Sequence, residues 1–185
     1  MLRKNKLALF GLVMLTLFVI TAALAPVLAP YDPNEIMENE IQAPSSRHMF
    51  GTDDLGRDIL SRIMHGARIS LSVAVIAVAV SITIGILFGS ISGYYGGLID
   101  SFIMRFTDIM LSFPTIFLIL AIQSILTPNI YNVMIVIGVT SWMGVARLVR
   151  GEFLSLKQRE YVEAARAIGC GDLRIIFRHI LPNSM

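Results

Sequence analysis

The sequence has few charged residues and a single cysteine, and each scarcity excludes a class of protein. Of its 185 residues 15% are charged, whereas soluble domains carry about a quarter. Because Cys170 is the only cysteine, an internal disulfide and a CxxC metal site are excluded, and we interpret it as a small filler in a turn. The net charge of +2 is too small to indicate nucleic-acid binding. With 55% hydrophobic residues, the composition predicts a polytopic membrane protein of the all-α class.

The sequence also lacks the motifs of common enzymes. It contains no GxxxxGK(S/T) phosphate loop, no HExxH and no GxSxG. Its three histidines, His48, His65 and His179, are scattered without the spacing of metal ligands. We therefore expect no catalytic residue, no metal, no cofactor and no ATP hydrolysis by this chain itself.

Four apolar segments are long enough to cross a bilayer, whose core requires about 20 mainly apolar residues. The first, about 7–28, follows three basic residues but is too long for a signal peptide, so we expect an uncleaved span. The other three cover about 69–93, 103–126 and 130–148. The TPN sequence at 127–129 predicts a tight turn between the last two.

The basic residues that flank the spans predict the orientation. The N-terminal tail has three basic residues and no acidic one. Segment 29–68 has four arginines against seven acidic residues, a net charge of −3, and segment 147–185 has seven basic against four acidic residues, a net charge of +3. Both basic ends are therefore expected in the cytoplasm, and 29–68 outside.

Two spans contain features that predict how helices pack. Small residues recur at every fourth position of the second span, which allows another helix to approach closely. Ordinary packing explains this stripe better than a substrate path does. Pro114 should kink the third span or mark its true start. Residues of the stripe are Ala77, Ser81, Gly85, Gly89 and Gly93.

Polar residues near the third span have structural and functional interpretations. An ionised group at the bilayer centre costs about 2.5–3.5 kcal/mol on insertion scales, so we place 99–110 at the cytoplasmic interface. There Arg105 could pair with Asp108 or Asp100, and an ion pair is favoured over a proton relay. Gln123 is interpreted as an interhelical hydrogen-bonding residue, with pore lining as the alternative.

In the outer segment, alternating apolar and charged residues predict a short helix near 55–65 that leads into the second span. Asp54 and Arg57, three positions apart, could pair across one helical turn. The segment should therefore fold against the bundle and resist proteolysis in an assembled complex.

The C-terminal segment has the pattern of two helices joined by a turn. Segment 160–168 has good helix formers at 163–167, Gly169 is a predicted C-terminal cap, and Asp172 is a predicted N-terminal cap. In the second helix one face is apolar, and Arg174 and Arg178 form a like-charged pair that acidic partner groups or anionic lipid headgroups would relieve. These residues alone leave docking to a partner and binding to the membrane surface about equally supported. The predicted apolar face consists of Leu173, Ile176, Phe177 and Ile180, and Pro182 ends the helix.

This segment resembles the EAA signature of permeases of the ATP-binding-cassette importers. The resemblance rests on Glu163-Ala164-Ala165, Gly169 and Leu181-Pro182. His179 stands where the general pattern has isoleucine, but RHILPN is similar to the form in the peptide and nickel branch. FGTDDLGRDILSR, SGYYGG and GVARLVRGEFLSL are also similar to C-type permeases of that branch, so the resemblance covers essentially the whole chain.

The resemblance implies a permease subunit that translocates peptides or a related small solute across a bacterial inner membrane. It implies a type I bundle of six spans, of which this chain has four, and thus a chain truncated after the EAA loop. The implied parts are an N-terminal segment with the first span (1–48), an extracytoplasmic segment (49–66), and an incomplete permease domain (67–185) whose coupling loop covers 150–185.

The resemblance also implies partners, with no role for nucleic acid. They are a second homologous permease, two cytoplasmic ATPase subunits, an extracytoplasmic solute-binding protein and the lipid bilayer. The implied contacts with the ATPases are Glu163, Ala164, Ala165, Gly169, Leu181 and Pro182. The alternative is a channel or membrane scaffold of another class, whose amphipathic C-terminal helix binds only lipid.

Overall fold

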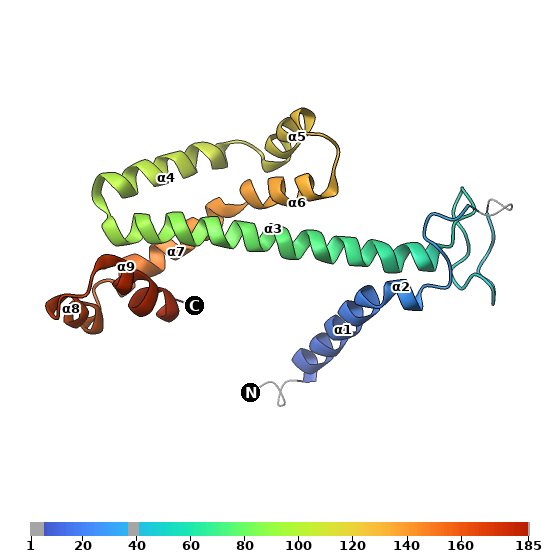
Figure 1. Cartoon of the computed structure of the whole chain (residues 1–185), viewed down its shortest axis with the longest axis horizontal. Coiled ribbons are helices and arrows are strands. Elements are labelled where there is room, and N and C mark those ends of the chain that lie inside the picture. Colours follow the sequence, from blue (N-terminus) through green and yellow to red (C-terminus); the bar gives the residue numbers. More distant parts are fainter. Residues whose placement is uncertain (1–5, 37–40, 185) are drawn as a thin grey trace. The chain divides into compact units, whose positions relative to one another are not determined.

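The computed structural model describes residues 6–36 and 41–184, and these are helical except for loops and one isolated β-bridge, Thr52–Asp58. Arg3, Lys4, Glu38 and Glu40, which entered the charge comparison, lie outside the described residues. The chain divides into two compact units, Met1–Ser72 and Val73–Met185 (Figure 1). The elements are α1 (Lys6–Ala23), α2 (Ala25–Leu28), α3 (Ile59–Tyr95), α4 (Gly97–Ser112), α5 (Thr115–Ile125), α6 (Ile130–Val139), α7 (Trp142–Leu156), α8 (Glu160–Ala167), α9 (Asp172–Arg174), a π-helix (Ile175–Ile180) and a 3-10 helix (Leu181–Asn183).

Three helices of the described chain are long and apolar enough to cross a membrane, and a bent fourth pair brings the number to four. They are α1, α3 and the combined α6–α7. The bent pair is α4–α5, whose axes differ by 87° on either side of Phe113 and Pro114. The predicted effect of Pro114 is confirmed, although α4 begins at Gly97, earlier than the predicted span. α7 likewise continues to Leu156, beyond the predicted end at 148.

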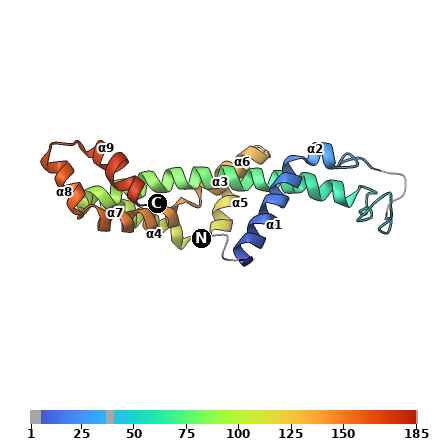
Figure 2. The same cartoon turned by 90° about the horizontal axis from the view of Figure 1, so that it is seen from below.

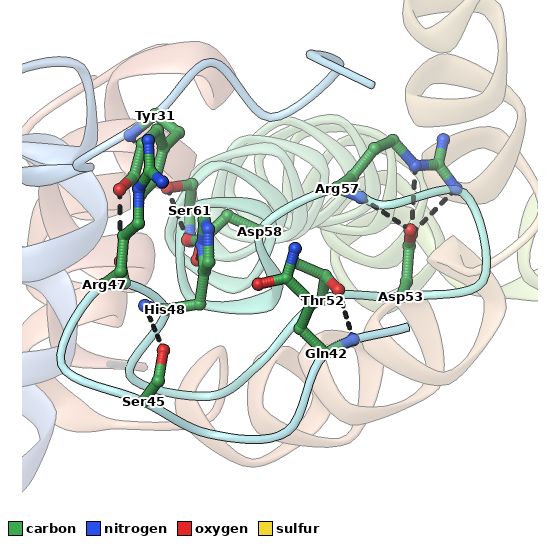
Figure 3. A network of polar contacts seen from close by, with 10 residues as sticks. All are labelled: Tyr31, Gln42, Ser45, Arg47, His48, Thr52, Asp53, Arg57, Asp58 and Ser61. Carbon is green, nitrogen blue, oxygen red and sulfur yellow. Dashed lines mark hydrogen bonds and ion pairs between the residues drawn. The ribbon is translucent and has the colours of Figure 1, made fainter. Parts of the chain in front are cut away.

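The first unit contains a hydrogen-bonded loop ahead of α3 (Figure 3). Nδ1 of His48 lies 3.0 Å from Oδ1 of Asp58, and both side chains are buried. The amide and the hydroxyl of Ser61 each donate to Oδ2 of Asp58 at 2.8 Å. The centre of the Tyr31 ring lies 4.9 Å from that of His48, with the two rings tilted by 34°, and the Tyr31 amide donates to the Ser61 hydroxyl. Asp58 thus binds His48 and Ser61 directly, and Tyr31 joins the same group through those two residues.

Asp53 forms a second polar centre in the same loop. Its Oδ2 accepts from Nε and Nη2 of Arg57, each at 2.9 Å, and also pairs with Arg62. Its Oδ1 accepts from the amides of Leu55 and Arg57. The predicted Asp54–Arg57 pair is therefore wrong, because Asp53 closes a turn here instead of a helix. The helix itself begins at Ile59 and continues without interruption into the predicted second span.

Asp58 makes the stability of this loop dependent on pH. Burial raises the pKa of Asp58, but hydrogen bonds from the Ser61 amide, His48 and the Ser61 hydroxyl together hold it below its usual range. A carboxyl group whose folded pKa lies below the unfolded value of about 3.9 stabilises the fold above that pH. This stabilisation is lost as the pH falls through the folded pKa.

We expect hydrogen exchange of residues 44–62, corrected for intrinsic rates, to accelerate only below about pH 4. Asp58→Asn should weaken this dependence and, at neutral pH, destabilise the loop by about 1–3 kcal/mol, because its buried donors lose a charged acceptor. The exposed Asp54→Asn is the matched control and should behave as wild type. Equal exchange in Asp58→Asn and wild type at pH 7 would contradict the assignment.

In the second unit the stripe of small residues on α3 faces α6 and α7, as predicted for close helix packing. Gly85 lies against Val145, and Gly93 lies against Phe153. On α6, Gly138 packs against Val80 of α3 in the same manner. Both views show α7 running along the C-terminal half of α3 (Figures 1 and 2).

Two ion pairs join α4 to α7. Arg150 binds Asp100 with two hydrogen bonds, Nε to Oδ1 at 2.5 Å and Nη2 to Oδ2 at 2.6 Å. Arg147 pairs with Asp108. The prediction that Arg105 would pair with these carboxylates is wrong, because helix packing brings arginines from a distant part of the sequence to them.

Gln123 on α5 does not make the predicted interhelical hydrogen bond through its amide nitrogen. Nε2 is buried and has no hydrogen-bond partner among the described residues. The pore-lining alternative is not tested by this observation.

Candidate functional site

The candidate site is the helix–turn–helix segment 160–183, which follows α7. Its first arm is α8, and its second arm consists of α9, the π-helix and the 3-10 helix. α8 has Glu160 and Glu163 in its first turn and Arg166 in its last, an arrangement that complements the helix dipole. Both views place α8 and α9 beside the C-terminal end of α3 (Figures 1 and 2).

Gly169 ends α8 as predicted. Its φ is +83°, a left-handed conformation that glycine adopts without steric cost. The Gly169 amide donates to the Arg166 carbonyl at 2.9 Å, and the Cys170 amide donates to the Ala165 carbonyl at 3.0 Å. These two bonds form a Schellman motif, which satisfies carbonyl groups at the helix end and reverses the chain.

The second arm differs from the predicted amphipathic α-helix. Gly171, not Asp172, occupies the N-cap position of α9, which has three residues and continues as a π-helix. In the π-helix the amide at 181 donates to the carbonyl of Ile176, five residues earlier. In this arm Ile175, Ile176 and Ile180 are buried, whereas Leu173 and Phe177 of the predicted apolar face are exposed, so that face is divided between the interior of the chain and its surface. Pro182 lies in the 3-10 turn that follows.

Both arms rest on one apolar cluster at the ends of α3 and α7. Within it the side chains of Phe153, Val162, Ile175 and Ile180 have no exposed surface. The cluster fixes the helix pair to the two membrane helices that precede it. Its buried members are Tyr94, Phe153, Val162, Ala165, Ile175, Ile176 and Ile180.

The structure separates the six predicted contact residues into exposed and internal ones. Ala165 is only 3% exposed and belongs to the apolar cluster, so its side chain packs within this chain. Leu181 is half-buried against the same cluster. The four exposed residues are Glu163, Ala164, Gly169 and Pro182.

Three exposed apolar side chains at the site were not predicted as contacts. Ile168 is 81% exposed, Leu173 69% and Phe177 56%. The sequence placed Leu173 and Phe177 on the apolar face of the second helix without assigning them to a partner, and the signal for Ile168 was an apolar side chain beside the Gly169 turn. With Arg174 and Arg178, also exposed, they give the segment a surface that is both apolar and basic. Within residues 6–36 and 41–184, no group of three or more potential ligands could hold a metal ion.

The comparisons with known proteins agree with this architecture. Residues 85–185 match the family described as "Binding-protein-dependent transport system inner membrane component", and residues 1–45 match the N-terminal transmembrane domain of oligopeptide transport permease C. The dipeptide transport system permease protein DppC of Alkalihalophilus pseudofirmus is 47% identical over the whole chain, which covers 61% of that protein.

Two proteins of Bacillus subtilis are similar over the same extent. The oligopeptide transport system permease protein OppC is 40% identical over 99% of this chain and 60% of its own length. The dipeptide permease protein DppC is 38% identical over the whole chain and 58% of its own length. The chain thus spans about 60% of the length of these relatives. It is a multi-pass membrane protein and belongs to the family of binding-protein-dependent transport system inner membrane components.

Proposed function

We propose that the chain acts as a permease subunit of an ATP-driven importer for peptides or a related small solute. It works with a second homologous permease, two cytoplasmic ATPase subunits and an extracytoplasmic solute-binding protein. The observation that carries the proposal is the exposed helix–turn–helix surface on a buried apolar cluster at the ends of α3 and α7. A partner that binds this surface is connected to the membrane helices through the apolar cluster. The peptide solutes are taken from the names of the relatives.

The mechanism follows from the packing of the helix–turn–helix segment against the ends of α3 and α7. When ATP closes the ATPase pair, the docked α8–α9 segment moves with it. Because Val162, Ala165 and the π-helix isoleucines are packed against Phe153 of α7, a displacement of the segment also displaces that helix. Alternating access of the solute path is then a rigid displacement of α3 and α7, driven from the cytoplasmic side.

Ala164 provides the test of docking. It is exposed on α8, beside Glu163, so a tryptophan there leaves the apolar cluster intact but obstructs the approach of a partner. Ala165, proposed from the sequence for the same role, is unsuitable because a tryptophan there would disrupt the cluster. We expect Ala164→Trp to reduce recovery of the ATPase subunits from detergent at least tenfold and to abolish uptake, as a substitution at the centre of an interface does.

Ala43→Trp is the matched control, since Ala43 is an exposed alanine of the outer segment. It should leave recovery of the ATPases unchanged. If the segment only binds lipid, Ala164→Trp should be neutral or strengthen membrane binding, because tryptophan favours the interface. Equal recovery and normal uptake with Ala164→Trp would reject docking through this surface.

We propose further that both chain ends lie in the cytoplasm and that 29–68 faces outward, from the −3 and +3 net charges of the flanking segments. In a Cys170→Ser background, an impermeant thiol reagent should label Ser46→Cys with the inner membrane intact. It should label Ala167→Cys only after that membrane is opened. Both positions are exposed, so the reverse pattern would refute this orientation.

A further inference from the structure

Tyr94 contacts both arms of the helix–turn–helix segment. It lies in the last turn of α3, is 7% exposed, and belongs to the apolar cluster. Its hydroxyl donates to Oδ1 of Asp172, the first residue of α9, at 2.7 Å. The guanidinium carbon of Arg166, in the last turn of α8, lies 5.5 Å from the centre of its ring. One side chain therefore reaches across the Gly169 turn to both helices.

The hydrogen bond to Asp172 and the cation–π contact with Arg166 differ in kind from the other contacts that hold the helix–turn–helix segment on the apolar cluster. The other members of the cluster are aliphatic or phenyl side chains, whose contacts are not directional and permit rotation of one helix against another. A hydrogen bond to a carboxylate and a cation over an aromatic ring both depend on geometry. The Tyr94 contacts consequently set the angle of α8 and α9 relative to α3.

The end of α3 is itself anchored, so it can transmit a displacement. The Lys157 ammonium donates to the Gly93 carbonyl at 2.9 Å. The Asp100–Arg150 pair fixes the start of α4 to α7, and Ser92 of α3 also donates to Asp100. A movement of the helix pair thus reaches a fixed end of α3 through Tyr94.

We propose that Tyr94 is a positioning residue for coupling, which transmits the movement of the α8–α9 segment to α3 through Asp172 and Arg166. This inference rests on the proposed function. Without the Asp172 bond, the segment still packs on the apolar cluster and still docks. It then rotates against α3, so that ATP is hydrolysed with less movement of the membrane helix and less solute is moved per ATP.

Tyr94→Phe tests this, because it removes the hydroxyl and keeps the ring that packs in the cluster and faces Arg166. In the assembled importer in proteoliposomes, solute uptake per ATP hydrolysed should fall roughly tenfold, a factor typical of losing a hydrogen bond to a charged group. ATPase recovery and ATP hydrolysis should remain at the wild-type level. Asp172→Ala should give the same fall, and the double variant should be no worse than either single one.

Tyr95→Phe is the control, since Tyr95 is 48% exposed and its hydroxyl donates to none of the described residues. An unchanged ratio of uptake to hydrolysis in Tyr94→Phe would overturn the inference while leaving docking intact. A fall in Tyr94→Phe without one in Asp172→Ala would also overturn it, because the hydroxyl would then act through a group other than Asp172. Failure of the wild-type chain to recover ATPase subunits would reject the proposed function, and the inference with it.

Discussion

A leucine in place of Gly89 is expected to abolish recovery of the folded protein from detergent. A Cβ atom at Gly89 would lie 2.6 Å from the Ala146 carbonyl oxygen and 2.8 Å from Cβ of Val149. The first neighbour is backbone, so no side-chain rotation can relieve the overlap and α7 must move away from α3. That movement would also open the contacts at Gly85 and Gly93, which are equally close.

Even the destabilisation caused by Gly89→Ala should be measurable. Overpacking a well-packed site typically costs about 1–3 kcal/mol, which corresponds to a fall in Tm of roughly 2–12 °C for a chain of this size. Gly144 on α7 is the matched control, because nothing lies within 4 Å of a Cβ atom there. Gly144→Ala and Gly144→Leu should both purify with the wild-type Tm. A monodisperse Gly89→Leu protein of unchanged Tm would show that α3 and α7 do not pack through this stripe.

This packing was predictable from the sequence because the information is local. Small residues at every fourth position lie on one side of a helix whatever the rest of the chain does, and that side must be where another helix approaches. The same holds for the turn at Gly169, which requires a left-handed residue between two helical segments. In both cases the residue type records a steric requirement of the backbone.

The ion pairs were not predictable in the same way. Arg105 lies within reach of Asp100 and Asp108 in the sequence, but their partners are Arg150 and Arg147, fifty and thirty-nine residues away. Which arginine meets a carboxylate depends on the register of α4 against α7, and no local pattern specifies it. The pairing within the loop ahead of α3 was not predictable for the same reason. There Asp53 binds Arg57 in place of Asp54, and it also accepts hydrogen bonds from backbone amides.

The candidate site contains one feature that the local sequence predicts and one that it does not. Val162 and Ala165 are three positions apart and share the buried side of α8, so the inward direction of Ala165 was available from the spacing. For the second arm, an α-helical period was assumed, and a π-helix changes which residues face inward. Leu173 and Phe177 are exposed, and their side chains enlarge the proposed docking surface.

Gly169→Val is expected to abolish transport while the protein still folds and inserts. At the observed φ of +83° a β-branched residue is strained by at least about 1–2 kcal/mol, although no atom lies within 4 Å of the new Cβ. The strain is relieved by changing the turn, which breaks the Cys170 amide bond to the Ala165 carbonyl and redirects α9. Gly169→Val therefore changes the angle between α8 and α9 and leaves the packing of α3 against α7 intact.

Gly171→Val is a control in the same turn, because Gly171 has a φ of −70°, which any residue adopts, and open space around its Cβ position. It should transport normally. Gly169→Asn should retain part of the activity, since asparagine tolerates the left-handed region better than valine does. The measurement is uptake by the assembled importer, with Tm and membrane insertion followed in parallel. Equal losses in Gly169→Val and Gly171→Val would mean that bulk in the turn matters and its backbone conformation does not, so the angle between α8 and α9 would have no part in coupling.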